Sequence, residues 1–193
     1  IEVDFDGEQV FAKDGSASIS LKDIGNRAMA NNGKALEVTE SHSSPVSPPP
    51  FMVGMAEIEM DQETCDFELV NYVAVVDCGT PINPAIARVQ TEGGLGQGIG
   101  MAMFEDVTRS EKGRVYENSF MQYKLPTRVD VGNIRVEFES SYEPTGPFGV
   151  KSIGEVVINT PSPAIAAAVA NATGVQIREL PITPEKIFKE LHK

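Results

Sequence analysis

A strand-like apolar run followed by a glycine-rich helical segment constrains this chain more than any other feature. The run VAVVD, residues 73–77, is apolar up to its aspartate, as expected of a strand that is buried on both faces. Asn83 and Pro84 then form a strong helix start, because asparagine caps free N–H groups and proline at the first helical position has none. We expect this helix to extend to about Asp106.

The predicted helix has an unusual density of interior glycines. They occupy positions 93, 94, 96, 98 and 100, and each costs roughly 1 kcal/mol of helix stability relative to alanine. A helix that accepts this cost usually does so because another group approaches its backbone closely. The stretch GGLGQGIG is nevertheless no dinucleotide fingerprint, since no register of it satisfies GxGxxG and it lies inside a helix.

The elements around this helix predict an α+β fold, with mixed β-sheets and helices packed on them. Four stretches have the alternation or apolar content of strands: residues 51–60, 66–76, 134–142 and 175–180. Helices are expected after Ser162 and Thr183, each of which is followed by proline, and the first of them should end at Gly174. Strands and helices alternate without the regular spacing of parallel strand–helix–strand units.

The first fifty residues are expected to form a separate region. Residues 1–15 alternate around Asp6-Gly7, a hairpin signal, and a helix capped by Ser20 should follow and stop at Asn31-Asn32-Gly33. Residues 39–50, TESHSSPVSPPP, predict either an extended loop over the surface, which we favour, or a linker between domains. We therefore expect an N-terminal hairpin, helix and Ser/Pro-rich connection over 1–50, and a principal domain over 51–193.

Composition excludes several classes of function. The formal net charge of −12 argues against binding to nucleic-acid phosphates or to anionic lipid. No apolar run approaches the roughly 20 residues of a membrane helix, and no signal peptide opens the chain. Cys65 and Cys78 have no metal-binding spacing, so we expect no protein-encoded metal site, and two thiols fit a reducing cytoplasm.

Glu155 is the strongest candidate for a catalytic group. It ends the glycine-rich loop GPFGVKSIGE, residues 146–155, and is followed by Val156, Val157 and Ile158. A carboxylate that is desolvated by apolar neighbours ionises at higher pH than usual, which suits a general base near neutral pH. Position and neighbours alone leave open whether Glu155 is an ordinary loop glutamate.

Three segments resemble motifs of the molybdenum hydroxylases, a family that includes xanthine dehydrogenase, aldehyde oxidoreductase, nicotinate hydroxylase and aerobic carbon monoxide dehydrogenase. In the first segment the matching residues are Asp77, Gly79, Ile82, Asn83, Pro84, Gln90, Gly93, Gly94, Gln97, Gly98, Gly100, Ala102 and Glu105. The run from Lys151 to Glu155 resembles the family's KxxGE loop, whose glutamate is the active-site base. Residues 179–188 resemble its closing segment, whereas the first fifty residues match less clearly.

The resemblance implies a molybdopterin-binding-domain fold, a two-layer sandwich, with residues 51–193 as the C-terminal part of a larger molybdenum subunit. The cofactor would be molybdopterin with molybdenum, often as the cytosine dinucleotide, and no side chain would bind the metal. Gln90 would hydrogen-bond the pterin, and the glycines at 93 and 94 would let the cofactor or a neighbouring loop pack closely. The backbone lying against the molybdenum site would be that of Lys151, Ser152, Ile153 and Gly154.

The implied activity is hydroxylation of a purine, another N-heterocycle or an aldehyde, with Glu155 as general base and water as the source of oxygen. Electrons would leave through iron–sulfur clusters, and in some members FAD, on other domains or subunits of an oligomeric complex. Because the chain starts at Ile1 within strand-like sequence, we expect a fragment that is inactive alone. Two alternatives are a non-catalytic relative that serves in binding or assembly, and an unrelated small-molecule-binding module.

Overall fold

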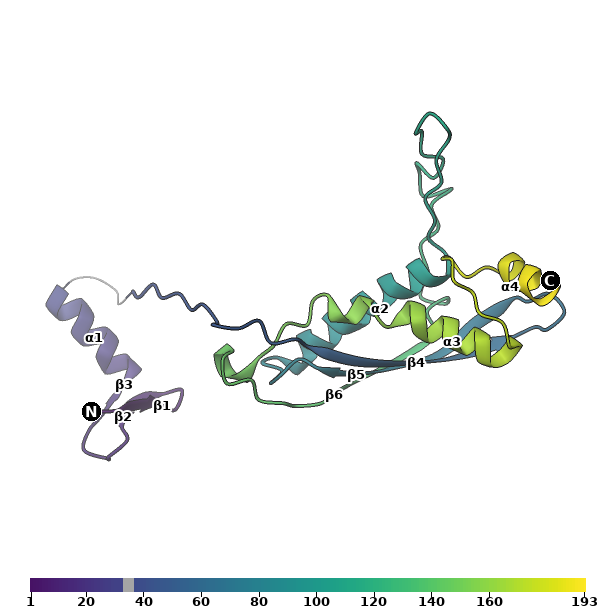
Figure 1. Cartoon of the computed structure of the whole chain (residues 1–193). Coiled ribbons are helices and arrows are strands. Elements are labelled where there is room, and N and C mark those ends of the chain that lie inside the picture. The colour runs from purple at the N-terminus through teal and green to yellow at the C-terminus, as the bar shows by residue number, and fades with distance from the viewer. Residues whose placement is uncertain (33–36) are drawn as a thin grey trace. The chain divides into compact units, whose positions relative to one another are not determined.

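The computed structural model describes residues 1–32 and 37–193 and contains two compact units, Ile1–Ser43 and Ser44–Lys193 (Figure 1). The boundary between the units falls within the Ser/Pro-rich residues 39–50. This stretch is exposed along almost its whole length. The stretch therefore lies between the two units, and the choice between a surface loop and a linker stays a prediction.

The first unit is a small antiparallel sheet followed by a helix. Its elements are β1 (Val3–Phe5), β2 (Gln9–Ala12), β3 (Ser18–Ser20) and α1 (Leu21–Asn32), with the strands paired in chain order. The predicted hairpin is confirmed, and Asp6 Oδ1 accepts hydrogen bonds from two backbone N–H groups of its turn. Ser20 caps α1 as predicted, since its Oγ accepts a hydrogen bond from the Asp23 N–H at 3.1 Å. Gly33, part of the predicted stop signal, lies outside the described residues.

The second unit contains a mixed three-stranded sheet. Its strands are β4 (Phe51–Met60), β5 (Phe67–Asp77) and β6 (Asn133–Phe138), in the spatial order β4-β5-β6. The pair β4–β5 is antiparallel and the pair β5–β6 is parallel. The predicted α+β class is confirmed, and the long connection that a parallel pair requires contains the glycine-rich helix.

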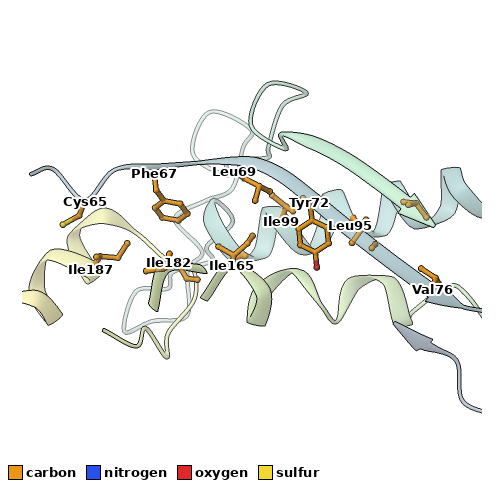
Figure 2. Close-up of a cluster of buried hydrophobic side chains, with 14 of the residues drawn as sticks. Cys65, Phe67, Leu69, Tyr72, Val76, Leu95, Ile99, Ile165, Ile182 and Ile187 are labelled. Atoms are coloured by element: carbon orange, nitrogen blue, oxygen red, sulfur yellow. The ribbon is translucent and has the colours of Figure 1, made fainter. Parts of the chain in front are cut away.

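Helices cover one face of this sheet. They are α2 (Pro84–Met103), α3 (Pro161–Thr173) and α4 (Pro184–Leu191). Tyr72 and Val76 of β5 form one buried cluster with side chains of all three helices, among them Leu95, Ile165 and Ile187 (Figure 2). Burial of these apolar side chains is what joins the helical layer to the sheet.

The other face of the sheet is open, which corrects the expectation that residues 73–77 are buried on both faces. Phe51, Val53 and Met55 of β4 are more than half exposed on this side. Val73 and Val75 of β5, the cross-strand partners of Met55 and Val53, are only half-buried. No described element covers this face, so the apolar run meets the core with alternate residues only.

A β-bulge decides which residues of β5 meet the core. The register between β4 and β5 shifts opposite Val70, which becomes an additional residue in β5. Leu69 and Tyr72 consequently both point into the core, although a regular strand would place them on opposite faces.

The helix boundaries follow the predicted signals with small shifts. Asn83 Oδ1 caps α2 by accepting a hydrogen bond from a backbone N–H at 3.1 Å, and α2 ends at Met103, slightly before the expected Asp106. Helix α3 begins after Thr160, earlier than Ser162, and ends at Gly174, whose φ is +79°. No described helix has the length and apolarity of a membrane span.

Residues 175–180 form no strand, contrary to the prediction. Val175 and Ile177 pack against the core, whereas Gln176 and Arg178 are exposed, so the alternation that suggested a strand is present. No strand in the described ranges pairs with this segment. Its alternation therefore reflects burial of one side of an extended segment and not a sheet.

Candidate functional site

The loop that carries most of the predicted site, residues 146–155, is attached to the end of β5 by backbone hydrogen bonds. The Lys151 N–H donates to the Cys78 carbonyl at 2.7 Å, and the Thr80 N–H donates to the Gly149 carbonyl at 2.8 Å. These bonds make the two segments a short antiparallel pair that continues the direction of β5.

The close approach of the two segments requires glycine at position 79. Its φ is +71°, in the left-handed region that side chains rarely adopt. A Cβ at this position would overlap the Gly149 carbonyl oxygen and would lie 2.8 Å from the Lys151 nitrogen. Gly79 therefore allows the loop to lie directly against the end of β5.

A largely buried ion pair joins the same two segments through their side chains. Lys151 Nζ lies 2.8 Å from Asp77 Oδ2, and the two side chains are only 10% and 18% exposed. Asp77 Oδ1 accepts hydrogen bonds from Ser141 Oγ at 2.6 Å and from the Gly79 N–H at 3.0 Å. The Phe51 ring lies 5.7 Å from Lys151 Nζ, within the range of a cation–π contact.

The donors around Asp77 keep its carboxylate ionised. Burial alone raises the pKa of Asp77, but the hydrogen bonds from Lys151, Ser141 and Gly79 outweigh it and hold the pKa at about 2, below the ordinary 3.8. In the sequence, Asp77 matches a family motif but has no predicted role. Its position at the end of an apolar, strand-like run was the available signal, whereas its contact with Lys151 depends on the fold.

Glu155 lies at the end of this loop, immediately before the short helix η2 (Val156–Ile158), and its side chain is exposed. The apolar residues that follow it face the protein: Val157 is fully buried, and Val156 packs against the core. These apolar neighbours therefore pack inward and leave the Glu155 side chain exposed.

The glycines of α2 have different surroundings: Gly94 and Gly98 meet η2 and the start of α3, Gly100 meets Glu105 and Pro126, and the others face open space. A Cβ at Gly94 would overlap Cγ2 of Val157, and a Cβ at Gly98 would lie 2.6 Å from Cγ of Pro161. At Gly93 nothing lies within 4 Å of the added carbon. The close approach predicted for this helix thus involves a neighbouring segment at Gly94, while Gly93 exposes bare backbone.

Gln90 of α2 is exposed and lies four residues before the buried Gly94. Residues four apart share a helix face, and four residues advance the helix by about 6 Å. Residue numbers decrease in the same direction along both segments: Gly98 meets Ile158, and Gly94, one turn earlier, meets Val157. The turn that carries Gln90 therefore lies toward the end of the loop where Glu155 is found.

The loop presents unpaired backbone donors. The N–H groups of Ser152, Ile153 and Gly154 donate no hydrogen bond to the described part of the chain. Ser152 and Gly154 are exposed, whereas Ile153 is half-buried against the core and holds the loop down. Successive free N–H groups suit a ligand rich in acceptor oxygens and ring nitrogens. Within residues 1–32 and 37–193 no group of three or more His, Cys, Asp or Glu side chains could hold a metal ion.

Comparison with known proteins identifies the class to which this fold and site belong. Residues 1–132 match the family model of the molybdopterin cofactor-binding domain. The chain therefore belongs to the molybdenum hydroxylase family of xanthine dehydrogenases, aldehyde oxidoreductases and carbon monoxide dehydrogenases, as its three motifs predicted. The match includes the first fifty residues, where the motifs were less clear.

The relatives define how much of a complete protein this chain represents. The putative xanthine dehydrogenase molybdenum-binding subunit of Escherichia coli strain K12 is 34% identical over 177 residues, which cover 90% of this chain and 24% of that protein. Quinoline 2-oxidoreductase from Pseudomonas putida 86 superimposes with a TM-score of 0.67 at 34% identity, over 72% of this chain and 18% of that one. Cu,Mo-CO dehydrogenase shares the fold, with a TM-score of 0.86 at 24% identity, over 99% of this chain and 26% of that one. The chain thus spans about a quarter or less of each of them.

Proposed function

We propose that this chain supplies the general base, Glu155, and part of the cofactor-binding surface of a molybdopterin-dependent hydroxylase. The observation that carries the proposal is the placement of an exposed Glu155 at the end of a loop that is fixed to β5 and lies beside α2. An exposed carboxylate on a fixed backbone is available to a ligand, whereas the apolar residues after it anchor the segment.

The residues present fit a molybdopterin. The Gln90 amide would donate to and accept from the polar edge of the pterin, and the free N–H groups of Ser152, Ile153 and Gly154 would donate to it. The bare backbone at Gly93 would admit a flat ring, and Gly94 would keep η2 close to α2. When bound, the cofactor supplies the molybdenum centre that accepts electrons from the substrate.

Glu155 would accept a proton from the oxygen nucleophile that water provides, close to an electron-poor carbon of a purine, another N-heterocycle or an aldehyde. Because its side chain is exposed in this chain, its desolvation would come from cofactor, substrate and the remainder of the molybdenum subunit. Lys151 would hold the loop, with its backbone against the metal site.

The complete protein would require further components. We propose the remainder of the molybdenum subunit, iron–sulfur clusters and a flavin domain or subunit carrying FAD, assembled as a cytoplasmic oligomer. The cofactor would be molybdopterin, with the cytosine dinucleotide as its extended form. The chain by itself would be inactive, since it spans only about a quarter of its relatives.

The test is Glu155→Gln in the full-length enzyme with its partner subunits, assayed by purine- or aldehyde-dependent dye reduction and by molybdenum content. Turnover should fall by about 100-fold to 10,000-fold, the range expected for loss of a general base, with molybdenum content unchanged. Glu179→Gln, at an exposed glutamate outside the loop, is the control and should retain turnover. Full turnover of the Glu155 variant would refute the assignment, and a mature wild-type protein without molybdenum would favour the non-catalytic relative.

A further inference from the structure

We infer that Asp77 is a positioning residue for Glu155, which it holds in place through its ion pair with Lys151. The inference rests on the proposed function of Glu155, because positioning has meaning only if that carboxylate acts on a substrate. Asp77 itself lies at the end of β5 and would not contact the reacting atoms.

Lys151 is attached to β5 at two adjacent positions. Its backbone N–H donates to the Cys78 carbonyl at 2.7 Å, and its Nζ lies 2.8 Å from Asp77 Oδ2. The ion pair adds a side-chain attachment to the backbone hydrogen bonds that already join the two segments, so both the main chain and the side chain of Lys151 are fixed at the end of β5.

Asp77 is itself held in one orientation. Ser141 Oγ donates to its Oδ1 at 2.6 Å and the Gly79 N–H donates to the same oxygen at 3.0 Å, so Oδ2 is left for Lys151. The Phe51 ring lies on the lysine ammonium at 5.7 Å and limits its access to water. The position of Lys151 is thus determined by the sheet.

Glu155 lies on a short segment between two fixed points. Lys151 fixes one end, and Val157, packed where a side chain at Gly94 would lie, fixes the other. Ile153, half-buried against the core, supports the middle of the segment. If the ion pair were removed, the unpaired charge would move toward water and would carry the start of the segment with it.

The proposed experiment uses the full-length enzyme with its partner subunits and the variant Asp77→Asn, which keeps the shape of the side chain and removes its charge. We expect kcat per bound molybdenum to fall by about 10-fold to 100-fold, the effect of a displacement near 1 Å at a reacting group, with KM changed far less. Molybdenum content should stay near that of the wild type. Glu137→Gln is the matched control, since it breaks the exposed Arg135–Glu137 pair, of 2.9 Å, on β6.

A second readout does not depend on activity. Hydrogen exchange followed by mass spectrometry should show faster exchange of residues 149–151 in Asp77→Asn, by about tenfold or more, and no change in Glu137→Gln. Lys151→Met should reproduce both effects. The double variant of Asp77→Asn and Lys151→Met should have the same kcat as either single variant, because both substitutions remove the same ion pair. Lys151→Arg, which keeps the charge, should restore a large part of kcat.

The outcomes separate this inference from the proposed function. An unchanged kcat per molybdenum in Asp77→Asn, beside an inactive Glu155→Gln, would overturn the positioning role alone. Turnover retained in Glu155→Gln would overturn the proposed function. If Asp77→Asn fails to assemble, Ser141→Ala provides the test: it removes one hydrogen bond from Asp77 and should lower kcat by about threefold to tenfold, and an unchanged kcat there would also overturn the inference.

Discussion

The hydroxyl of Tyr72, in the middle of β5, donates a hydrogen bond of 2.9 Å to Oγ1 of Thr160, at the start of α3. Tyr72 is completely buried, and burial raises the pKa of its hydroxyl. Gly54 of β4 makes room for the pair, since a Cβ there would overlap the tyrosine hydroxyl and would lie 2.7 Å from Thr160 Oγ1. This bond connects the sheet to the segment that follows Glu155.

Tyr72→Phe should lower the free energy of unfolding by about 1 kcal/mol, because a buried hydrogen bond is lost and Thr160 keeps an unpaired hydroxyl. Urea unfolding of the full-length subunit measures the change. Tyr116→Phe, at a side chain that is 56% exposed, serves as the control and should leave the unfolding midpoint unchanged. Equal midpoints for Tyr72→Phe and the wild type would show that the bond contributes nothing.

Neighbouring glycines of α2 should respond to alanine in opposite directions. Gly93→Ala places a methyl group in open space and should stabilise the helix by up to about 1 kcal/mol. Gly94→Ala places it against Val157 and should destabilise the protein by about 1–3 kcal/mol through overpacking. Thermal unfolding of both variants checks the prediction, which fails if Gly94→Ala is as stable as Gly93→Ala.

The Asp77 carboxylate should make stability depend on acid pH. Its pKa is about 2 in the folded chain, below the ordinary 3.8, so the unfolded chain binds more protons between these values and stability falls as the pH drops through them. The contribution should be roughly 2 kcal/mol above pH 4 and should vanish below pH 2. Urea unfolding of the wild type and of Asp77→Asn at several pH values tests this. A stability difference that persists at the lowest pH would contradict it.

Alanine at position 79 should affect both stability and turnover. The positive φ alone costs about 1–3 kcal/mol for a residue with a side chain, and the added Cβ would also push residues 149–151 away from β5. Gly113→Ala is the matched control, since φ is +79° there but nothing lies within 4 Å. We expect both variants to unfold at lower temperature, and only Gly79→Ala to lose turnover per molybdenum. Normal turnover in Gly79→Ala would show that the loop tolerates displacement.

Local signals in the sequence predicted much of the fold. Asn83-Pro84 marked the start of α2, Gly174 marked the end of α3, and β4 has the predicted limits. Each of these signals depends on residues within a few positions of one another, so the chain sequence contains the whole interaction. The three motifs predicted the family, and the comparisons confirm it.

Interactions between distant segments were decided only by the tertiary structure. Residues 175–180 have strand alternation but pair with no strand in the described ranges, and one face of β5 is only half-buried because no described helix or strand covers it. The role of Gly94 follows from Val157 lying against it. Tertiary structure also decided the arrangement of the site. The sequence indicated Glu155 as a candidate, but only the fold shows that its side chain is exposed. Only the fold brings Asp77 into contact with Lys151, 74 positions away. Burial and pairing of this kind depend on which segments the packed core brings together, and no local pattern encodes that.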